Sequence, residues 1–233
     1  MPSRSRSRTP YVLAALAAVV VVIAVVAIVV AGSGEEADAP SPTAAPAPGA
    51  TGDASSSGAI DPVAARVIVR GDALAPFEGA TDSDPVIGSA APALTGTDYD
   101  GTPTEIRPGS DGPMMLVFLA HWCPHCNDEI PVLNEWRDSG AIPEDLRIVG
   151  VSTGVDPERP NYPPDEWLVE KDWQWDVLAD GPFDGSAPPA ALEAYGVTGY
   201  PFFTVIDADG NVAARGSGQL PIEQLEALVA RVA

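Results

Sequence analysis

The chain has 233 residues, enough for one sizeable domain and additional segments. Hydrophobic residues make up 45% of it, so at least part of the sequence can bury a core. The formal net charge is −21, from 33 acidic and 12 basic residues, which argues against nucleic-acid binding because phosphate contacts need clustered Lys and Arg. We interpret the acidic excess as a solvated surface rather than a site for a basic partner.

An uninterrupted apolar run covers residues 11–31, and about 20 helical residues are enough to cross a bilayer. Three arginines precede this run and acidic residues follow it. By the positive-inside rule, residues 1–10 would be cytoplasmic and everything after Ala31 extracytoplasmic. The alternative is a cleaved secretory signal, whose apolar stretch has about 7–15 residues. We therefore favour an uncleaved, single-pass signal anchor in the cell membrane.

The segment 32–85 is predicted to be a flexible tether followed by an extension of the domain. Its first part, to about residue 58, is rich in Ala, Pro, Ser, Thr and Gly and has almost no large apolar side chain, so it cannot bury enough surface to fold. In the extension, residues 67–69 could form a short strand, and Leu74 and Phe77 could pack on the domain.

From residue 86 to 233 the pattern is regular and predicts one domain. A hairpin is expected around the Asp100-Gly101 turn, with strands over 94–98 and 102–106. A buried strand over 114–120 and a helix starting at residue 123 follow. The later elements are strands over 146–151, 176–179, 202–206 and 212–215, and helices over 164–173, 188–195 and 221–232. This alternation predicts an α/β sheet with helices on both faces.

Both cysteines of the chain lie in the tetrapeptide Cys123-Pro124-His125-Cys126. A bridge across two residues closes too small a loop to stabilise a domain by restricting the unfolded chain. The pair therefore indicates reactivity or metal binding.

The position of the pair, between a buried strand and a helix, favours reactivity. Pro124 suits the first helical position, because its missing N–H is not needed there, and this places Cys123 at the helix cap. Unpaired N–H groups and the helix dipole would then stabilise the Cys123 thiolate. Cys126, one turn inward, is expected to be more buried. We expect Cys123 to attack a substrate disulfide and Cys126 to resolve the mixed disulfide.

His125 is expected to favour the thiolate further, because a protonated imidazole or its dipole stabilises negative charge nearby. Such stabilisation favours the reduced form and makes the disulfide more oxidising. We expect a reduction potential between about −270 mV and about −120 mV, the values of thioredoxin and of a strongly oxidising enzyme.

A metal site is the main alternative. His121, Cys123, His125 and Cys126 offer four ligands within six residues, and the chain has no other His or Cys. These four are too crowded to surround one ion tetrahedrally from a strand end and a single helical turn. We therefore expect neither a metal nor a bound cofactor; the redox group would be the Cys123–Cys126 disulfide itself. Two idle cysteines are a further alternative.

Three motifs resemble the thioredoxin superfamily, and most closely its membrane-tethered TlpA/ResA-like thiol–disulfide oxidoreductases. They are AHWCPHC at 120–126, YGVTGYP at 195–201 and VIDADG at 205–210. The resemblance covers residues 86–233. It implies a thioredoxin-like fold, a central mixed sheet flanked by helices, preceded here by the predicted transmembrane helix.

The resemblance also implies roles for residues outside the cysteine pair. The Tyr200-Pro201 bond would be cis and would lie beside the cysteines, with Tyr200 presenting backbone groups to an incoming peptide. Trp122 would pack over the site. Glu129 occupies the position of an acid that often serves as proton carrier or tuner of thiol pKa, the alternative being a solvated residue on the helix. The buried Asp that thioredoxins carry six residues before the first cysteine is Val117 here.

We therefore predict a monomeric, extracytoplasmic protein-disulfide oxidoreductase. The resemblance favours reduction of disulfides in exported proteins, such as apocytochromes before haem attachment, with electrons from a membrane or extracytoplasmic redox partner. The Pro-His pair instead resembles oxidising DsbA proteins, so a disulfide-forming oxidase or isomerase is the alternative. A Sco-like copper chaperone fits less well. The motif of those proteins resembles CxxxC with a distant downstream His, whereas this chain has CxxC and no His after His125. A peroxiredoxin-like peroxidase would need a peroxidatic cysteine in a different setting.

Overall fold

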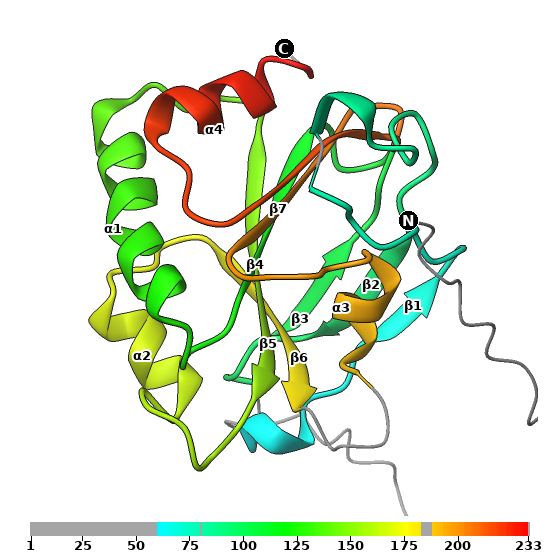
Figure 1. Ribbon diagram of the computed structural model, residues 1–233. Helices are drawn as coiled ribbons and strands as arrows, with labels where there is room; N and C mark the ends of the chain where they lie inside the picture. Colours follow the sequence, from blue (N-terminus) through cyan, green and yellow to red (C-terminus); the bar gives the residue numbers. More distant parts are fainter. Residues whose placement is uncertain (1–59, 80, 183–187, 233) are drawn as a thin grey trace, which may run out of the picture. The chain divides into compact units, whose positions relative to one another are not determined.

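The computed structural model of the chain describes residues 60–79, 81–182 and 188–232. Its centre is a five-stranded sheet in the order β6-β5-β4-β7-β8 (Figure 1). Strands β4, β5 and β6 are parallel, while β7 runs antiparallel to β4 and β8 antiparallel to β7. The bounds are β4 (Met114–Leu119), β5 (Arg147–Val155), β6 (Asp176–Pro182), β7 (Phe202–Ile206) and β8 (Val212–Ser217). The predicted α/β fold with a mixed central sheet is confirmed.

Strand β4 lies at the middle of this sheet because its side chains are apolar on both faces. All six residues are buried, and successive side chains alternate between the two cores. Met115, Val117 and Leu119 belong to one hydrophobic cluster, and Met114, Leu116 and Phe118 to the other. A strand buried on both sides in this way is held firmly, so its carboxyl end is a rigid base for the residues that follow.

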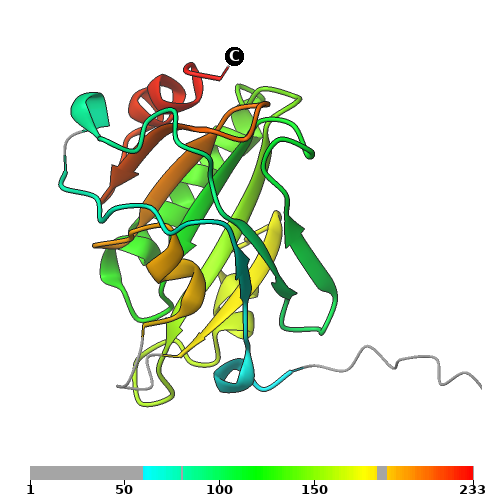
Figure 2. The ribbon, with the colours of Figure 1, turned by 90° about the vertical axis from the view of Figure 1, so that its right-hand side faces the viewer.

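Helices cover the two faces unequally. The first cluster contains residues of α1 (Pro124–Ser139), α2 (Pro164–Glu170) and α4 (Ile222–Val229). The second contains residues of α3 (Ala190–Ala194) and of the segment before β2. Figure 2 shows α3 and this segment in front of the sheet, with α1 behind it. The sheet therefore separates two cores, and α1 begins at the carboxyl end of β4.

The extension predicted before residue 86 packs on the domain. Its strand β1 (Ile68–Arg70) pairs with β2 (Ala93–Thr97), which pairs with β3 (Pro103–Ile106) in a three-stranded antiparallel sheet. Leu74 and Phe77 are buried in the second cluster, as their apolar character suggested. Two single 3-10 turns, η1 (Pro62–Ala64) and η2 (Thr81–Ser83), complete the described part of this segment.

A buried ion pair also fastens this extension. The Arg215 guanidinium, on β8, donates from Nε and Nη2 to the two carboxylate oxygens of Asp84, each at 2.7 Å. Its Nη1 donates to the carbonyl oxygens of Ala75 and Tyr195. Burial raises the pKa of Asp84, but Arg215 outweighs that effect and holds it below the ordinary value. Fully bonded buried charges of this kind are costly to separate.

Several predicted bounds need correction. The helix predicted over 164–173 ends at Glu170, because Asp172 takes a left-handed backbone with φ of 57°. The strand predicted to end at residue 151 continues to Val155, since Ser152 and Thr153 find hydrogen-bond partners and can be buried. The helices predicted over 188–195 and 221–232 are shorter, as Ala190–Ala194 and Ile222–Val229.

The predicted anchor at 11–31 and the spacer that follows it lie outside the described residues. Within 60–79, 81–182 and 188–232, no helix is long and apolar enough to cross a membrane.

Candidate active site

The CPHC motif lies where β4 passes into α1. Cys123 is the N-cap of α1, with an extended backbone, and Pro124 is the first helical residue. The Cys123 backbone N–H donates to the carbonyl of Ala120, which closes the turn between strand and helix. The sequence produces this junction because the apolar strand β4 ends at Leu119 and proline at the first helical position needs no N–H partner.

The two thiols have opposite electrostatic surroundings. A hydrogen bond from the Cys126 thiol, together with the backbone N–H groups of His125 and Cys126 and the charge of His125, lowers the pKa of Cys123 to about 6, although burial opposes this. Burial raises the pKa of Cys126 far above its ordinary value, and donation to Cys123 adds to this rise. Cys126 is fully buried and Cys123 is 6% exposed. Cys123 is therefore the nucleophile of the pair on electrostatic grounds.

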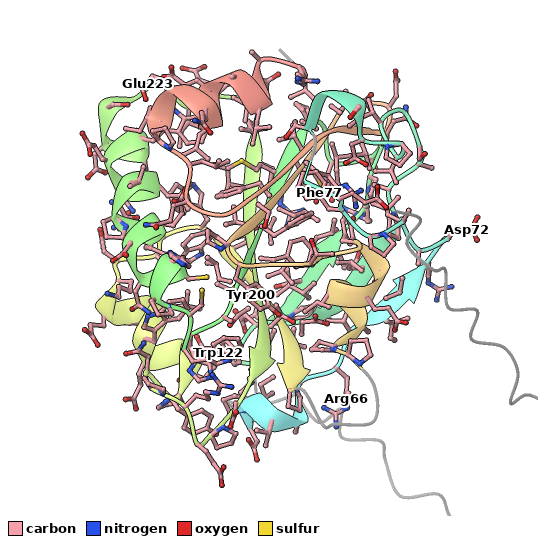
Figure 3. The ribbon with its side chains drawn as sticks, in the orientation of Figure 1. Arg66, Asp72, Phe77, Trp122, Tyr200 and Glu223 are labelled. Atoms are coloured by element: carbon pink, nitrogen blue, oxygen red, sulfur yellow. The ribbon has the colours of Figure 1, made fainter. Side chains whose placement is uncertain are left out.

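A cis peptide bond joins Tyr200 and Pro201, and it faces the nucleophile, as the resemblance implied. The carbonyl oxygen of Tyr200 lies 3.8 Å from Cys123 Sγ. The Tyr200 ring packs edge-on against Trp122, with centroids 5.8 Å apart (Figure 3). Trp122 donates its indole N–H to the carbonyl of Gly154, and the Arg159 guanidinium lies 4.7 Å from its ring centroid. Trp122, directly before Cys123, therefore packs between Tyr200, Arg159 and the end of β5.

Glu129 lies one turn beyond Cys126 on α1, and its carboxylate is fully buried. Its Oε2 accepts the backbone N–H of Leu220 at 3.0 Å, while Oε1 has no partner among the described residues. Burial raises the pKa of Glu129 to about 7, against the lowering effect of the Leu220 N–H. The alternative of a solvated Glu129 is therefore wrong. A carboxyl that titrates near neutrality beside a buried thiol can carry a proton.

His125 and His121, the two histidines weighed as metal ligands, lie in different surroundings. His125 is exposed, and its Nδ1 is 2.9 Å from Gln219 Oε1. His121 is buried: its Nδ1 donates to the Pro160 carbonyl at 2.7 Å, and its Nε2 accepts the Asp156 N–H at 3.2 Å. Both ring nitrogens of His121 are thus used within the protein. This arrangement weakens the metal interpretation, which needed His121 as a ligand.

Sequence reasoning missed the loop between β8 and α4. Its residues Gln219 and Leu220 contact His125 and Glu129, which lie more than 90 positions earlier in the chain. No local pattern marks such contacts.

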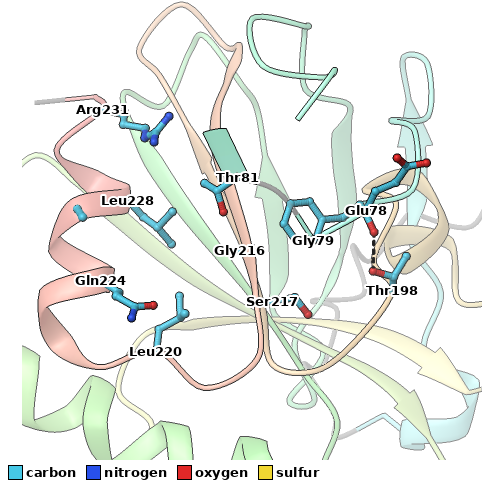
Figure 4. Close-up of a pocket in the computed structure, with 12 residues that line it drawn as sticks. Glu78, Gly79, Thr81, Thr198, Gly216, Ser217, Leu220, Gln224, Leu228 and Arg231 are labelled. Carbon is cyan, nitrogen blue, oxygen red and sulfur yellow. Dashed lines mark hydrogen bonds between the residues drawn. The ribbon is translucent and has the colours of Figure 1, made fainter. Parts of the chain in front are cut away.

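On the outer side of this loop, a surface groove of about 610 Å³ runs between α4 and the extension (Figure 4). Phe77, Thr198, Ser217, Leu220 and Leu228 are among its lining residues, and the Thr198 hydroxyl donates to the Phe77 carbonyl.

Comparison with known proteins places the chain in a family. The profile of the AhpC/TSA family matches residues 87–215, more than half of the chain. The thiol-disulfide oxidoreductase ResA of Bacillus thuringiensis subsp. konkukian (strain 97-27) is 25% identical over 150 residues, covering 63% of this chain and 78% of that protein. The methylamine utilization protein MauD of Paracoccus versutus is 33% identical over 82 residues, covering 35% of this chain and 40% of that protein.

The fold has solved counterparts as well. A putative thiol:disulfide interchange protein DsbE from Chlorobium tepidum superposes with a TM-score of 0.50 at 21% identity, covering 63% of this chain and 98% of that one. At this level of identity the likeness concerns the fold alone. Taken with the family profile, it identifies the chain as a member of the AhpC/TSA family with a thioredoxin-like fold.

Proposed function

We propose that the protein is a thiol–disulfide oxidoreductase that exchanges disulfides with exported proteins through Cys123 and Cys126. The observation that carries this proposal is the contrast between two adjacent thiols. The pKa of Cys123 is lowered to about 6 at the helix cap, whereas burial raises that of Cys126. The name of the relative ResA supports the same chemistry.

In the reducing direction, the Cys123 thiolate attacks one sulfur of a substrate disulfide. The substrate S–S bond breaks, an S–S bond to Cys123 forms, and the departing substrate thiolate takes up a proton. Cys126 then loses its proton and attacks Cys123 Sγ, which releases the second substrate sulfur as a thiolate. Two electrons pass to the substrate, and the Cys123–Cys126 disulfide remains. A membrane or extracytoplasmic redox partner that carries a dithiol must then reduce the Cys123–Cys126 disulfide again.

Glu129 is the proposed acceptor of the Cys126 proton. The Cys126 thiol is too buried to ionise unaided, and the Glu129 carboxylate lies one helical turn away. A base whose pKa is near the working pH exchanges protons efficiently in both directions. Trp122, Tyr200 and Pro201 would bind the substrate, because the backbone before the cis-proline lies beside the nucleophile.

Reduction of exported proteins, including apocytochromes, is our preferred direction, by resemblance to TlpA/ResA-like proteins. Disulfide formation is the second candidate, and one observation favours it. A thiolate stabilised at pKa of about 6 stabilises the reduced form and makes the disulfide more oxidising. The redox state recovered from cells distinguishes the two: a mostly dithiol form indicates a reductase, and a mostly disulfide form an oxidase.

We further propose that the domain works outside the cytoplasm, anchored by the apolar segment 11–31, and that it needs no bound cofactor or metal. The length of that segment and the arginines before it support the anchored arrangement. The electrons of the reaction reside on the two sulfurs, so the proposed chemistry is complete without another redox group.

The test is a trapping experiment in cells with Cys126→Ala. Without the resolving thiol, substrates should remain bound to Cys123 as mixed disulfides that a reductant releases. Cys123→Ala is the matched control and should trap nothing. Equal yields from the two variants would refute the exchange mechanism, because the reaction would then not depend on which thiol is the nucleophile. The identity of the trapped proteins would give the pathway.

A further inference from the structure

The loop between β8 and α4 contacts three parts of the candidate active site with three consecutive residues. The Gly218 N–H donates to the carbonyl of Pro201 at 2.9 Å. Gln219 Oε1 lies 2.9 Å from His125 Nδ1, and the Leu220 N–H donates to Glu129. The two outer contacts hold the loop against the cis-proline and against α1. Gln219 is therefore held between two fixed neighbours.

The contact between Gln219 and His125 has a defined direction. The Oε1 atom of an amide can only accept a hydrogen bond, so the imidazole must donate from Nδ1. In its neutral form His125 then carries its proton on Nδ1 and leaves Nε2 as an acceptor. A neutral imidazole free in water prefers the other tautomer, with the proton on Nε2. The bond therefore selects both the tautomer and the orientation of an otherwise exposed ring.

The ring selected in this way belongs to the residue two positions after the nucleophile, in the first turn of α1. The charge of His125 and its backbone N–H both favour the Cys123 thiolate. An exposed ring that rotated freely would spend part of its time away from the sulfur, and water would screen its charge. A ring held by a hydrogen bond acts from one position.

We propose that Gln219 is a positioning residue, which holds the His125 ring in the Nδ1–H form beside Cys123 and through it tunes the reactivity of that thiol. This inference rests on the proposed thiol–disulfide exchange and adds a determinant of it from a loop 94 residues away from His125. Gln219 touches neither sulfur in any contact that the structure records, so its effect passes through His125.

The expected size of the effect is modest, because both side chains are exposed. A solvent-exposed hydrogen bond of this kind changes an equilibrium by about twofold. Loss of the bond should therefore raise the proton affinity of the Cys123 thiol by about twofold, which is about 0.3 in its pKa. The ratio of the two neutral His125 tautomers should move by about the same factor, toward the Nε2–H form.

His121 provides an internal reference, because the chain has only two histidines. Its Nδ1 donates to Pro160 and its Nε2 accepts from Asp156, so its neutral ring is also in the Nδ1–H form. These partners are independent of Gln219. A spectrum of the two histidines thus contains one ring that should respond to substitution of Gln219 and one that should not.

The experiment is ¹⁵N NMR of the full-length protein with labelled histidine, recorded at about pH 8.5, well above the ordinary imidazole pKa of about 6.5. In the unsubstituted protein we expect His121 in the Nδ1–H form and His125 enriched in that form relative to a free imidazole. In Gln219→Leu, the tautomer ratio of His125 should shift toward Nε2–H by about twofold while that of His121 stays unchanged. Gln219→Glu keeps an acceptor and should retain the Nδ1–H form. Gln224→Leu, a similar change on α4, should alter neither ring.

A second measurement follows the consequence at Cys123. The midpoint of the pH dependence of Cys123 alkylation should be higher in Gln219→Leu than in the unsubstituted protein. When Gln219→Leu is added to His125→Ala, the midpoint should stay where it is in His125→Ala alone. A His125 tautomer ratio that is the same in the unsubstituted protein and in Gln219→Leu would overturn the proposal. An equal shift in both backgrounds would overturn it too. If the tautomer responds but the protein exchanges no disulfides, the proposed function fails and the positioning role stands.

Discussion

The carboxylate of Glu129 is held by the backbone N–H of Leu220 through Oε2, and its Oε1 has no partner among the residues that the structure describes. A buried carboxylate with one hydrogen bond and no paired cation is destabilised in its charged form. Burial accordingly raises its pKa to about 7. The site therefore contains an acid that changes charge near neutral pH, one helical turn from Cys126.

The first prediction concerns the stability of Glu129→Gln. The folded-state pKa of Glu129 is above its unfolded value of 4.5, so the folded protein holds this proton more tightly than the unfolded chain does. The stability gained by holding this proton is then fully present below about pH 4.5, and it is lost as the pH rises through 7. At pH 8 the Gln variant should be more stable than the parent by on the order of 1–3 kcal/mol. Urea unfolding at pH 5 and pH 8 measures the difference.

The same variant should exchange disulfides more slowly, because Gln cannot accept the Cys126 proton. We expect a loss of about a hundredfold in resolution of the mixed disulfide, at the lower end of the usual gain from a positioned base. Glu135→Gln, on the same helix, is the control and should change neither quantity. A Glu129→Gln protein with unchanged stability at pH 8 and an unchanged rate would contradict the role assigned to this acid.

The second prediction concerns the pH dependence of Cys123 alkylation. Because its pKa is about 6, the rate with iodoacetamide should rise through about pH 6 and be constant by pH 8. An ordinary thiol, with a pKa near 8.5, would still be accelerating there. Replacement of His125 by Ala should move the midpoint upward, because the charge and orientation of the ring favour the thiolate. A midpoint near 8.5 in the unsubstituted protein would remove the basis for assigning Cys123 as the nucleophile.

The third prediction concerns the buried ion pair between Asp84 and Arg215. Asp84→Ala leaves a guanidinium buried without its carboxylate, and we expect a loss of about 3–5 kcal/mol in the free energy of unfolding. Arg107→Ala removes the ion pair between an exposed guanidinium and Asp111, which keeps its pair with Arg147, and should cost less than about 1 kcal/mol. Similar losses in the two variants would show that the Asp84–Arg215 pair does not hold the extension before residue 86 on β8 as the structure describes.

The elements of the fold could be predicted from the sequence wherever a single local pattern decides the structure. Strand β4 is an apolar run, and the N-terminus of α1 is marked by Cys123 and Pro124. The bounds of β5 were missed, because Ser152 and Thr153 are polar and their burial depends on the Tyr99 hydroxyl and the Asp180 carboxylate. Partners so far away in the chain leave no trace in a local pattern.

The candidate site shows the same division. The cysteines and the cis-proline are recognisable from short motifs, since their chemistry requires particular residue types at fixed spacing. The contact of Gln219 with His125 joins residues 94 positions apart and is not marked by any motif. His121 was considered only as a metal ligand, although its ring instead ties β4 to the loop around Pro160.

That role of His121 leads to the fourth prediction. Its burial lowers its pKa below the ordinary 6.5, so the unfolded chain takes up a proton more readily than the folded protein does. The stability that the neutral ring contributes is therefore present above about pH 6.5 and is lost progressively as the pH falls through that value. Protonation also removes Nε2 as the acceptor for the Asp156 N–H.

His121→Asn separates this effect from the other titrating groups. Asparagine can replace the Nδ1–H donor to Pro160 but not the Nε2 acceptor, so the variant should be less stable at pH 7 by about 1–3 kcal/mol. Glu129 and Asp180 titrate alike in both proteins, and their contributions cancel in the difference. The gap in unfolding free energy, measured in urea, should narrow between pH 7 and pH 5, because only the parent loses the neutral ring. A gap that stayed constant or widened would mean that His121 is not held as a neutral acceptor in the folded protein.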